Sequence, residues 1–521
     1  MAIERVKRIL DTVHGYVQIP DVYVKEIIDT PEFQRLRRIE QTSCRALFPS
    51  ARHDRFIHSI GVFHIGTLIS DHLWAQACGS NERKEGGAFP TNEYTASIIA
   101  TYRLACLLHD VGHTPFSHTF EKFFNNDQNE LLGTLTNLLL PEDPDFYHDF
   151  TTPMPGGKKN KLTPHEFLSA IIAIERFGHI IVKKYHVWKE FEKCGGDKAL
   201  LARMIVGCPY SNPNKSLENA FIDLIHGFVI DADGLDYACR DVWASGYSTS
   251  KVDISRLIEA IRIYNDNGKY VVCFDAKAIN EILSVLQVKS FQSEYVFSHH
   301  SVIFEQKLLV EAMKSAAFQL EVPYGQRIST DRETALQYLC DIDLFRAKGH
   351  STRNGQYFIR YVMDDDFVSL MKMFPDDKYV NQWFSRKYDF VPIWKTREAF
   401  MSDLPEDIIN NDSIGEAFWL YSDDCLQFLK ERYGINDDEV MVLDVDFDNR
   451  NSRICSIYLY VNRSIHPFSD YYKDIDDEKF KKSVTFKYIY IPKRVLNEHI
   501  QLGDIRHSLM AECKKYYSHY K

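Results

Sequence analysis

The chain has 521 residues, of which 45% are hydrophobic and 26% charged, with a formal net charge of -11 and an isoelectric point near 6.0. This length suggests two or three domains, and the acidic balance excludes a surface built mainly to grip nucleic-acid phosphates. The 11 cysteines are scattered and form no CxxC pair, which is typical of reduced thiols in a cytosol. No signal-peptide core and no apolar run of roughly 18 residues is present, so we expect a soluble cytoplasmic protein away from membranes.

The part of the chain up to about residue 315 has a mainly helical pattern. Threonine followed by proline predicts three helix starts, because threonine can cap free N–H groups and proline suits the first helical position. The three pairs are Thr30-Pro31, Thr114-Pro115 and Thr163-Pro164. Glu166 would complete a capping box in the third. Residues 141–161 are rich in proline and glycine and predict a loop, and residues 270–276 predict a short strand.

Beyond about residue 320 the pattern changes to strand-like runs separated by charged helices. These runs are QYFIRYVM, EVMVLDVDF and ICSIYLYV. We therefore predict a mainly α protein, with a helical core over residues 1–318 and a smaller C-terminal α+β lobe over residues 319–521.

The stretch HDVGHTPFSH, from His109 to His118, places three histidines and one aspartate directly after the apolar run LACLL. Unpaired buried polar groups cost several kcal/mol each, so these side chains need protein partners or a metal ion. The adjacent His109 and Asp110 suit a divalent metal. Pro115 is expected to begin a helix with His118 in its first turn, where an anion such as phosphate is favoured. Glu121, three residues further on, could orient the His118 imidazole.

This stretch also allows two other interpretations. A lone buried histidine is usually a satisfied core residue, but His-Asp-x-x-His followed by a third histidine favours chemistry. The spacing also matches the H-E-x-x-H zinc protease motif, with aspartate in place of glutamate. That motif lies on one helix, whereas Gly112 and Pro115 interrupt the helix here, so the protease is the weaker interpretation.

Further ligands are expected in two other stretches. In RHDRFIHSIGV, Arg55 and His58 share a helical face, so His58 could complete a metal shell while Arg55 reaches an anion. In IDADGLDYACRD, three side chains spaced by four residues form one stripe along a helix, which is either a site or an ordinary polar face. The stripe consists of Asp233, Tyr237 and Asp241. Asp236 and Arg240 are also four residues apart and predict a plain surface ion pair.

Together these stretches resemble the HD-domain phosphohydrolases. The resemblance is closer to the deoxynucleoside triphosphate triphosphohydrolases, both the bacterial dGTPase-like enzymes and the animal enzyme that joins a sterile-alpha motif to an HD domain. It runs from about Lys7 to about Ala317, and its motifs occur in the family's order. They are DTVHGYVQI, IIDTPEFQRLRRIEQ, ARHDRFIHSIGV, LLHDVGHTPFSH, LTPHEF and IDADGLDYACRD. Beyond the core, YVMDDDFVSLM still looks like the family's C-terminal lobe.

The resemblance implies a helical HD-domain catalytic core that hydrolyses a dNTP to deoxynucleoside and inorganic triphosphate. One divalent metal, which could be manganese, iron, zinc or magnesium, would be bound by His58, His109, Asp110 and Asp233. The catalytic groups would be His113 and His118 facing the phosphates, with His118 as general acid and Glu121 as its acidic partner. The substrate contacts would be Arg55 and His165 at the phosphates, Tyr237 and Asp241 at the sugar, and Gln41 near its 3′-hydroxyl.

The resemblance also implies a regulatory nucleotide, accompanied by magnesium, and a homo-oligomer, with a tetramer favoured over a dimer or hexamer. At a first regulatory site the matching residues are Lys7, Asp29, Gln34 and Arg37. At a second site the matching residues are Arg256, Lys277 and His299, whereas the positions that differ are Leu10, Asp275 and Glu294. Three substrate-site positions also depart from the animal enzyme and leave the preferred dNTP open. They are Gly234 for a lysine, Thr42 for a leucine and Phe297 for a tyrosine.

Two other functions remain alternatives at this point. One is an HD-type phosphodiesterase that acts on cyclic or oligomeric nucleotides and keeps the same metal. The other is a nucleotide sensor or single-stranded nucleic-acid binder without catalysis, which would not need a metal shell. The cellular role of a dNTPase would be either to balance nucleotide pools or to deprive an invading phage of dNTPs.

Overall fold

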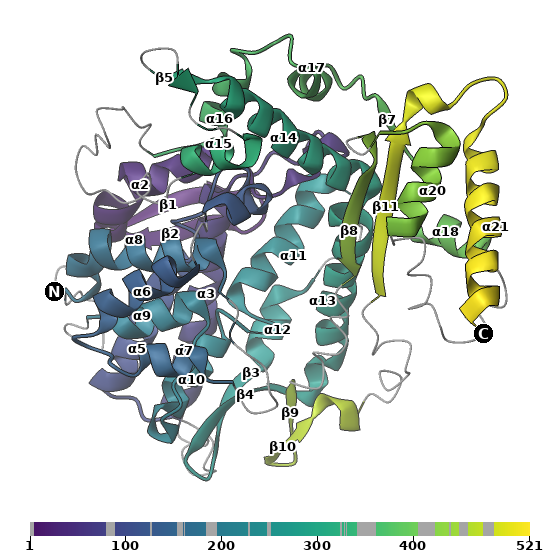
Figure 1. Cartoon of the computed structure of the whole chain (residues 1–521). Helices are drawn as coiled ribbons and strands as arrows, with labels where there is room; N and C mark the ends of the chain where they lie inside the picture. Colours follow the sequence, from purple (N-terminus) through teal and green to yellow (C-terminus); the bar gives the residue numbers. More distant parts are fainter. Residues whose placement is uncertain are drawn as a thin grey trace.

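The computed structural model describes most of the chain. The described residues are 5–79, 89–124, 128–153, 160, 162–183, 195–227, 230–246, 252–322, 326–327, 329, 331–340, 361–404, 423–436, 439–447, 457–471 and 484–520. Helices dominate this part (Figure 1), so the prediction of a mainly α protein is confirmed. No helix among these residues has the length and apolar character needed to cross a membrane.

Five helices form the centre of the N-terminal part. They are α3 (Arg55–Cys78), α5 (Glu93–Leu108), α8 (Pro164–Ile181), α9 (Lys198–Val206) and α11 (Ala232–Ser245). α5 contacts α3, α8 and α9 and is buried on nearly every side. A helix that is apolar all round lies in the interior of a protein. The residues that follow its last turn, His109 and Asp110, therefore start inside the core.

Other helices surround this centre and continue into the C-terminal part. They are α1 (Asp21–Tyr23), α2 (Pro31–Gln34), α6 (Gln128–Leu139), α7 (Phe146–Thr151), α10 (Ser216–Asp223), α12 (Ile254–Ala260), α13 (Ile279–Phe291), α14 (His300–Gln319), α15 (Arg332–Leu339), α16 (Asp364–Met371), α17 (Lys378–Ser385), α18 (Arg397–Asp403), α20 (Asp423–Tyr433) and α21 (Leu502–Tyr520). Two predicted helix starts are confirmed, because α2 begins at Pro31 and α8 begins at Pro164. The capping box predicted for α8 does not form, since the Thr163 side chain caps no N–H group. The predicted loop over 141–161 contains the short helix α7.

The third predicted helix start, after Thr114, is wrong. Phe116 and Ser117 have positive φ angles of 53° and 52°, a left-handed backbone that an α-helix cannot contain. Only a three-residue 3₁₀ turn follows, Ser117–Thr119. His118 therefore lies in this turn and not at the N-terminus of an α-helix, so the predicted contribution of a helix dipole at this position is absent.

Two small sheets and two hairpins complete the described fold. The strands are β1 (Val6–Asp11), β2 (Gly15–Pro20), β3 (Ile261–Asp266), β4 (Lys269–Asp275), β5 (Glu321–Val322), β6 (Gln326–Arg327), β7 (Phe390–Pro392), β8 (Met441–Phe447), β9 (Tyr458–Val461), β10 (Ser464–Pro467) and β11 (Val484–Pro492). One sheet has the order β10-β9-β4-β3 and the other has the order β7-β11-β8. β1 pairs with β2, and β5 pairs with β6. β4 confirms the strand predicted over 270–276.

The C-terminal lobe has a hydrophobic core of its own, in which the sheet β7-β11-β8 packs between α14 and the outer helices α20 and α21 (Figure 1). β8 and β9 confirm two of the strand-like runs, while residues 356–360 of the third lie outside the described part. The lobe is not separate from the helical core, because β9 pairs with β4 in a parallel register. α16 also packs against α14. The boundary between residues 318 and 319 stays a prediction.

Candidate active site

Four side chains from three helices converge at the C-terminal end of α5. His58 comes from α3, His109 and Asp110 follow α5, and Asp233 lies in the first turn of α11. The His58 Nε2 atom lies 3.3 Å from His109 Nε2, 2.9 Å from Asp233 Oδ1 and 3.7 Å from Asp110 Oδ2. Ligands bound to one ion at about 2.0–2.2 Å lie at similar mutual distances. The mixed nitrogen and oxygen set therefore fits one divalent metal.

The hydrogen bonding of His58 supports this assignment. Burial lowers the pKa of His58, but hydrogen bonds to the Asp233 and Asp236 carboxylates outweigh burial and raise the pKa to about 10. The nitrogen that faces Asp233 and His109 is Nε2, whereas Nδ1 bonds to Asp236 Oδ2 at 2.7 Å. A metal ion would take the place of the proton on Nε2. Asp236 would then hold the imidazole in the correct orientation, as a second partner of a ligating histidine usually does.

Asp236 and Arg240 do not form the surface ion pair predicted from their spacing. Both side chains are at most 1% exposed, and Arg240 donates two hydrogen bonds to Asp236 and two to Asp11. His14 Nε2 also lies 2.6 Å from Asp236 Oδ1. Although burial opposes it, Arg240 and the hydrogen bonds from His14 and His58 hold the pKa of Asp236 well below its ordinary value. The hairpin β1-β2 covers this face of α11, which the local spacing could not reveal.

Arg55 contacts both the metal-ligand group and the segment that follows Asp110 along the chain. Its guanidinium contacts Asp110 Oδ2 at 2.7 Å, the Ser117 hydroxyl at 3.0 Å and the Gln41 carbonyl at 3.1 Å. Burial opposes the ionised form of Asp110, but Arg55 and the neighbouring histidines keep the pKa of Asp110 well below its ordinary value. Arg55 is buried and bonded to protein groups through all three nitrogens, so its predicted contact with a phosphate stays a prediction.

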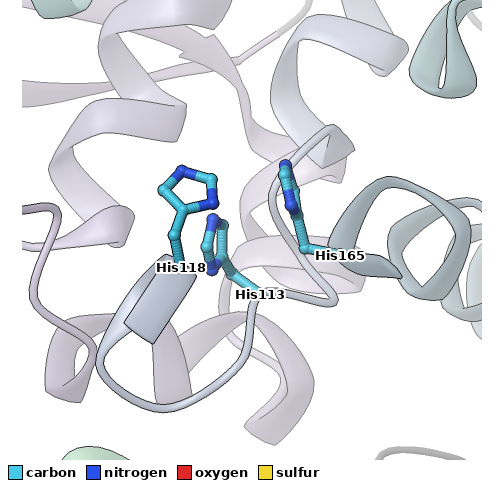
Figure 2. A group of neighbouring side chains, drawn as sticks. All are labelled: His113, His118 and His165. Atoms are coloured by element: carbon cyan, nitrogen blue, oxygen red, sulfur yellow. The ribbon is translucent and has the colours of Figure 1, made fainter. Parts of the chain in front are cut away.

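The second cluster contains three histidines, two of which share one carboxylate. His113, His118 and His165 face one another (Figure 2), with ring centroids 4.3–5.1 Å apart. Glu121 accepts a hydrogen bond from His118 Nδ1 at 2.9 Å and from His165 Nδ1 at 2.7 Å. Burial favours the neutral form of Glu121, but these two bonds lower its pKa. Burial lowers the pKa of His165, but Glu121 outweighs burial and raises it.

Residues predicted to contact the sugar lie on the same helix or close to it. Asp241 and Tyr237 follow Asp233 along α11. Asp241 Oδ1 lies 2.6 Å from His53 Nε2, and both side chains are buried. Gln41 is also buried, and its Oε1 atom has no hydrogen-bond partner among the described residues. These positions leave the predicted sugar contacts untested.

Lys289 was not predicted from the sequence. It lies on α13 and is buried, with Nζ 4.9 Å from the centroid of the Tyr237 ring. A Cβ atom at Gly234 would lie 2.6 Å from Asp231 Oδ1 and still closer to Lys289 Nζ. The absent side chain at Gly234 therefore makes room for a lysine that comes from another helix. Lys289 lies 55 residues after Gly234, so no local pattern in the sequence could indicate that the two residues meet.

The predicted regulatory residues form separate contacts at the surface. Lys7 Nζ lies 3.6 Å from Asp29 Oδ2, and Arg37 Nε donates to Gln34 Oε1 at 3.0 Å. The residues of the second predicted site each bond to a different neighbour, which is Glu281 for Arg256, Asp275 for Lys277 and the Ser301 backbone for His299. Both regulatory sites stay predictions.

The C-terminal lobe holds the backbone of the histidine segment. Asp364, the first residue of α16, accepts a hydrogen bond from the Phe116 N–H at 2.6 Å and from the Glu40 N–H at 2.9 Å. Arg35 donates a hydrogen bond to the His113 carbonyl. The left-handed backbone at Phe116 is therefore stabilised by a carboxylate almost 250 residues away. The stretch YVMDDDFVSLM contains Asp364, but its sequence did not predict that this carboxylate binds the backbone of the histidine segment.

Replacing Asp364 by alanine is expected to lower the free energy of unfolding by about 2–3 kcal/mol, because two buried N–H groups lose their acceptor. Asp365→Ala is the matched control. Its carboxylate is 67% exposed and pairs with Arg38 at the surface, so its removal should cost below about 1 kcal/mol. Urea denaturation of both variants tests this, and equal losses would contradict the assigned contact.

A second prediction concerns Gly112, where α8 packs against the HD segment. A Cβ atom at Gly112 would lie 2.5 Å from the Leu168 carbonyl carbon and closer still to the Ser169 backbone nitrogen. Gly112→Ala is expected to destabilise the protein by about 1–3 kcal/mol, since backbone atoms cannot move aside as a side chain does. Gly133→Ala on α6, where no atom lies within 4 Å of the new Cβ, should instead stabilise by about 0.5–1 kcal/mol. Thermal unfolding measures the stability of both variants. A Gly112→Ala variant as stable as the wild type would be inconsistent with this close packing of α8 against Gly112.

Comparison with known proteins identifies the family to which the chain is similar. The HD domain family model matches residues 55–134. An HD domain-containing protein of Acanthamoeba polyphaga mimivirus is 33% identical over 379 residues, which are 69% of this chain and 68% of that protein. The deoxynucleoside triphosphate triphosphohydrolase SAMHD1 homolog of Dictyostelium discoideum is 29% identical over 297 residues, 56% of this chain and 46% of that protein.

The chain spans about half the length of the SAMHD1 relatives that it matches. Among solved structures, a phosphohydrolase from Bacteroides thetaiotaomicron is similar in fold, with a TM-score of 0.59 at 18% identity, covering 94% of this chain and 100% of that chain. The chain belongs to the HD-domain family, and its relatives include SAMHD1-like dNTP triphosphohydrolases.

Proposed function

We propose that the chain is a metal-dependent dNTP triphosphohydrolase. The observation that supports this most is the continuity of residues 109–118, which begin with two candidate metal ligands and end with two histidines of the second cluster. Arg55 contacts both ends of this segment, through Asp110 and Ser117. A substrate phosphate bound at the metal group would therefore lie beside the histidines.

The proposed metal ligands are His58, His109, Asp110 and Asp233. A bound divalent ion would supply Lewis-acid chemistry, polarising the phosphoryl group and activating a water molecule. The mixed donor set suits manganese, iron, zinc or magnesium. Asp236 orients His58, and Arg55 keeps Asp110 ionised, which is the form in which a carboxylate binds a cation.

The proposed proton donor is His118. Its Nδ1 atom donates to Glu121, so the proton available for transfer is the one on Nε2. When water attacks the α-phosphorus, the bond from phosphorus to the 5′-oxygen breaks and this proton moves to the leaving oxygen. The products are a deoxynucleoside and inorganic triphosphate. His165, whose pKa is raised by Glu121, would face the phosphates as a cation.

We further propose that a nucleotide bound at the first predicted regulatory site activates the enzyme in a homo-oligomer. Lys7 and Arg37 supply exposed cationic groups there, and such groups suit nucleotide phosphates. A dNTP panel tested in pairs would identify an activator as a nucleotide that accelerates hydrolysis of another. The oligomeric state is tested by mass measurement in solution with and without that nucleotide.

The direct test of the proposed reaction incubates the purified chain with manganese and each dNTP, singly and in pairs, and measures deoxynucleoside and triphosphate. Formation of both products in equal amounts is expected for at least one dNTP. Hydrolysis of a cyclic dinucleotide with every dNTP left intact would instead indicate an HD-type phosphodiesterase. Tight nucleotide binding without turnover under any metal would indicate a sensor.

The proposed dNTP hydrolysis could serve either phage defence or the balancing of nucleotide pools. Phage plating on cells that carry the wild-type chain or an inactive variant distinguishes these two roles. Protection that depends on hydrolysis supports defence, whereas equal plating together with altered dNTP levels in uninfected cells supports pool balancing.

A further inference from the structure

The second histidine cluster has the geometry of a metal site in its own right. One ring nitrogen from each of His113, His118 and His165 lies within 4.8 Å of the other two. The three residues come from the loop after α5, the 3₁₀ turn and the first turn of α8. Figure 2 shows the three rings grouped together. We name these residues the histidine triad.

Glu121 determines which nitrogens of the triad are available. Its carboxylate can only accept hydrogen bonds, so both His118 and His165 donate from Nδ1. In the neutral rings Nε2 then carries the lone pair. A carboxylate that accepts from the second nitrogen of each ring is the usual partner of histidines that ligate zinc.

His113 supplies the third ligand. Its side chain is buried, and neither ring nitrogen has a hydrogen-bond partner among the described residues. An unsatisfied buried polar atom is unfavourable, and a metal bond would give one of the two nitrogens a partner.

We propose that the histidine triad is a second metal site that binds zinc and that zinc bound there inhibits the enzyme. Three imidazoles that release any Nε2 proton when they bind the ion, with an open fourth position, suit Zn²⁺, whereas Mg²⁺ prefers oxygen ligands. The His118 side chain is 63% exposed, which gives the ion a path from solvent. Inhibition rests on the proposed function, because zinc would occupy the lone pair of the proton donor and exclude phosphate. The binding of zinc to the triad does not depend on the proposed function.

The binding test measures zinc per chain after equilibrium dialysis against a zinc buffer of fixed free concentration. The wild type is expected to retain one more zinc ion per chain than His165→Ala. His118→Ala gives a second measurement with little risk to the fold, since its side chain is largely exposed. His179→Ala, an exposed residue on the same helix α8, is the matched control and should retain as much zinc as the wild type. Equal zinc in the wild type and both triad variants would overturn the proposal.

Anomalous diffraction at the zinc edge locates the ions. A peak bonded to the three triad nitrogens is expected in wild-type crystals and in Asp233→Ala, which weakens only the first metal group. Zinc found solely beside His58 and His109 would overturn the second site. Adding zinc to the manganese-loaded wild type is expected to reduce dNTP hydrolysis by about 10²-fold or more, the loss expected for removing a general acid.

The two proposals fail in different ways. If the zinc-free wild type hydrolyses no dNTP, the proposed function fails while the zinc content and the diffraction peak still test the triad. If hydrolysis is present but zinc at the triad leaves it unchanged, the inhibitory role is overturned.

Discussion

Replacing Arg240 by methionine is expected to lower the free energy of unfolding by about 3–5 kcal/mol, the usual cost of leaving buried charges without their partner. Arg240 is the cation that pairs with both Asp11 and Asp236, and all three side chains are at most 1% exposed. Methionine keeps the volume of the side chain but leaves two carboxylates facing each other in the core. Urea denaturation with and without manganese measures the loss.

The same variant should also weaken metal binding. Asp236 orients His58 through Nδ1, and without Arg240 the carboxylate would take up a proton and lose part of this function. Arg256→Met is the control, because Arg256 is 58% exposed and pairs with Glu281 at the surface, where an ion pair contributes below about 1 kcal/mol. A loss for Arg240→Met no larger than that of the control would refute the buried network.

The second large effect is expected at His118. His118→Gln should lower kcat for dNTP hydrolysis by about 10²–10⁴-fold, the range for removal of a general acid. Glutamine can still hydrogen-bond to Glu121 but cannot carry a proton to the leaving 5′-oxygen. Because the side chain is 63% exposed, the free energy of unfolding should change little. Triphosphate release under saturating dNTP separates the loss of turnover from any loss of binding.

His148→Ala on α7 serves as the control for this variant, since His148 is exposed and lies outside both clusters. Its kcat should equal that of the wild type. An unchanged kcat in His118→Gln would remove His118 from the role of proton donor, and His165 would then be the next residue to test.

The local sequence determined much of the site. Two ligands that follow an apolar helix are adjacent along the chain, so His109 and Asp110 had to lie together at the end of α5. The pair His118 and Glu121 is three residues apart, in two successive 3₁₀ turns, and meets at 2.9 Å. The mainly α fold also follows from the sequence, because long apolar periodic segments make the central helices.

The tertiary structure decided what covers each face. Spacing placed Asp236 and Arg240 side by side on α11, but whether that face meets water or the hairpin β1-β2 depends on residues more than 220 positions away. The left-handed turn at Phe116 depends in the same way on Asp364, and the space beside Gly234 depends on Lys289. Short-range periodicity describes the neighbours of a residue along one element. Burial and charge pairing between distant elements arise only when the chain packs, so these contacts could not be predicted from the sequence alone.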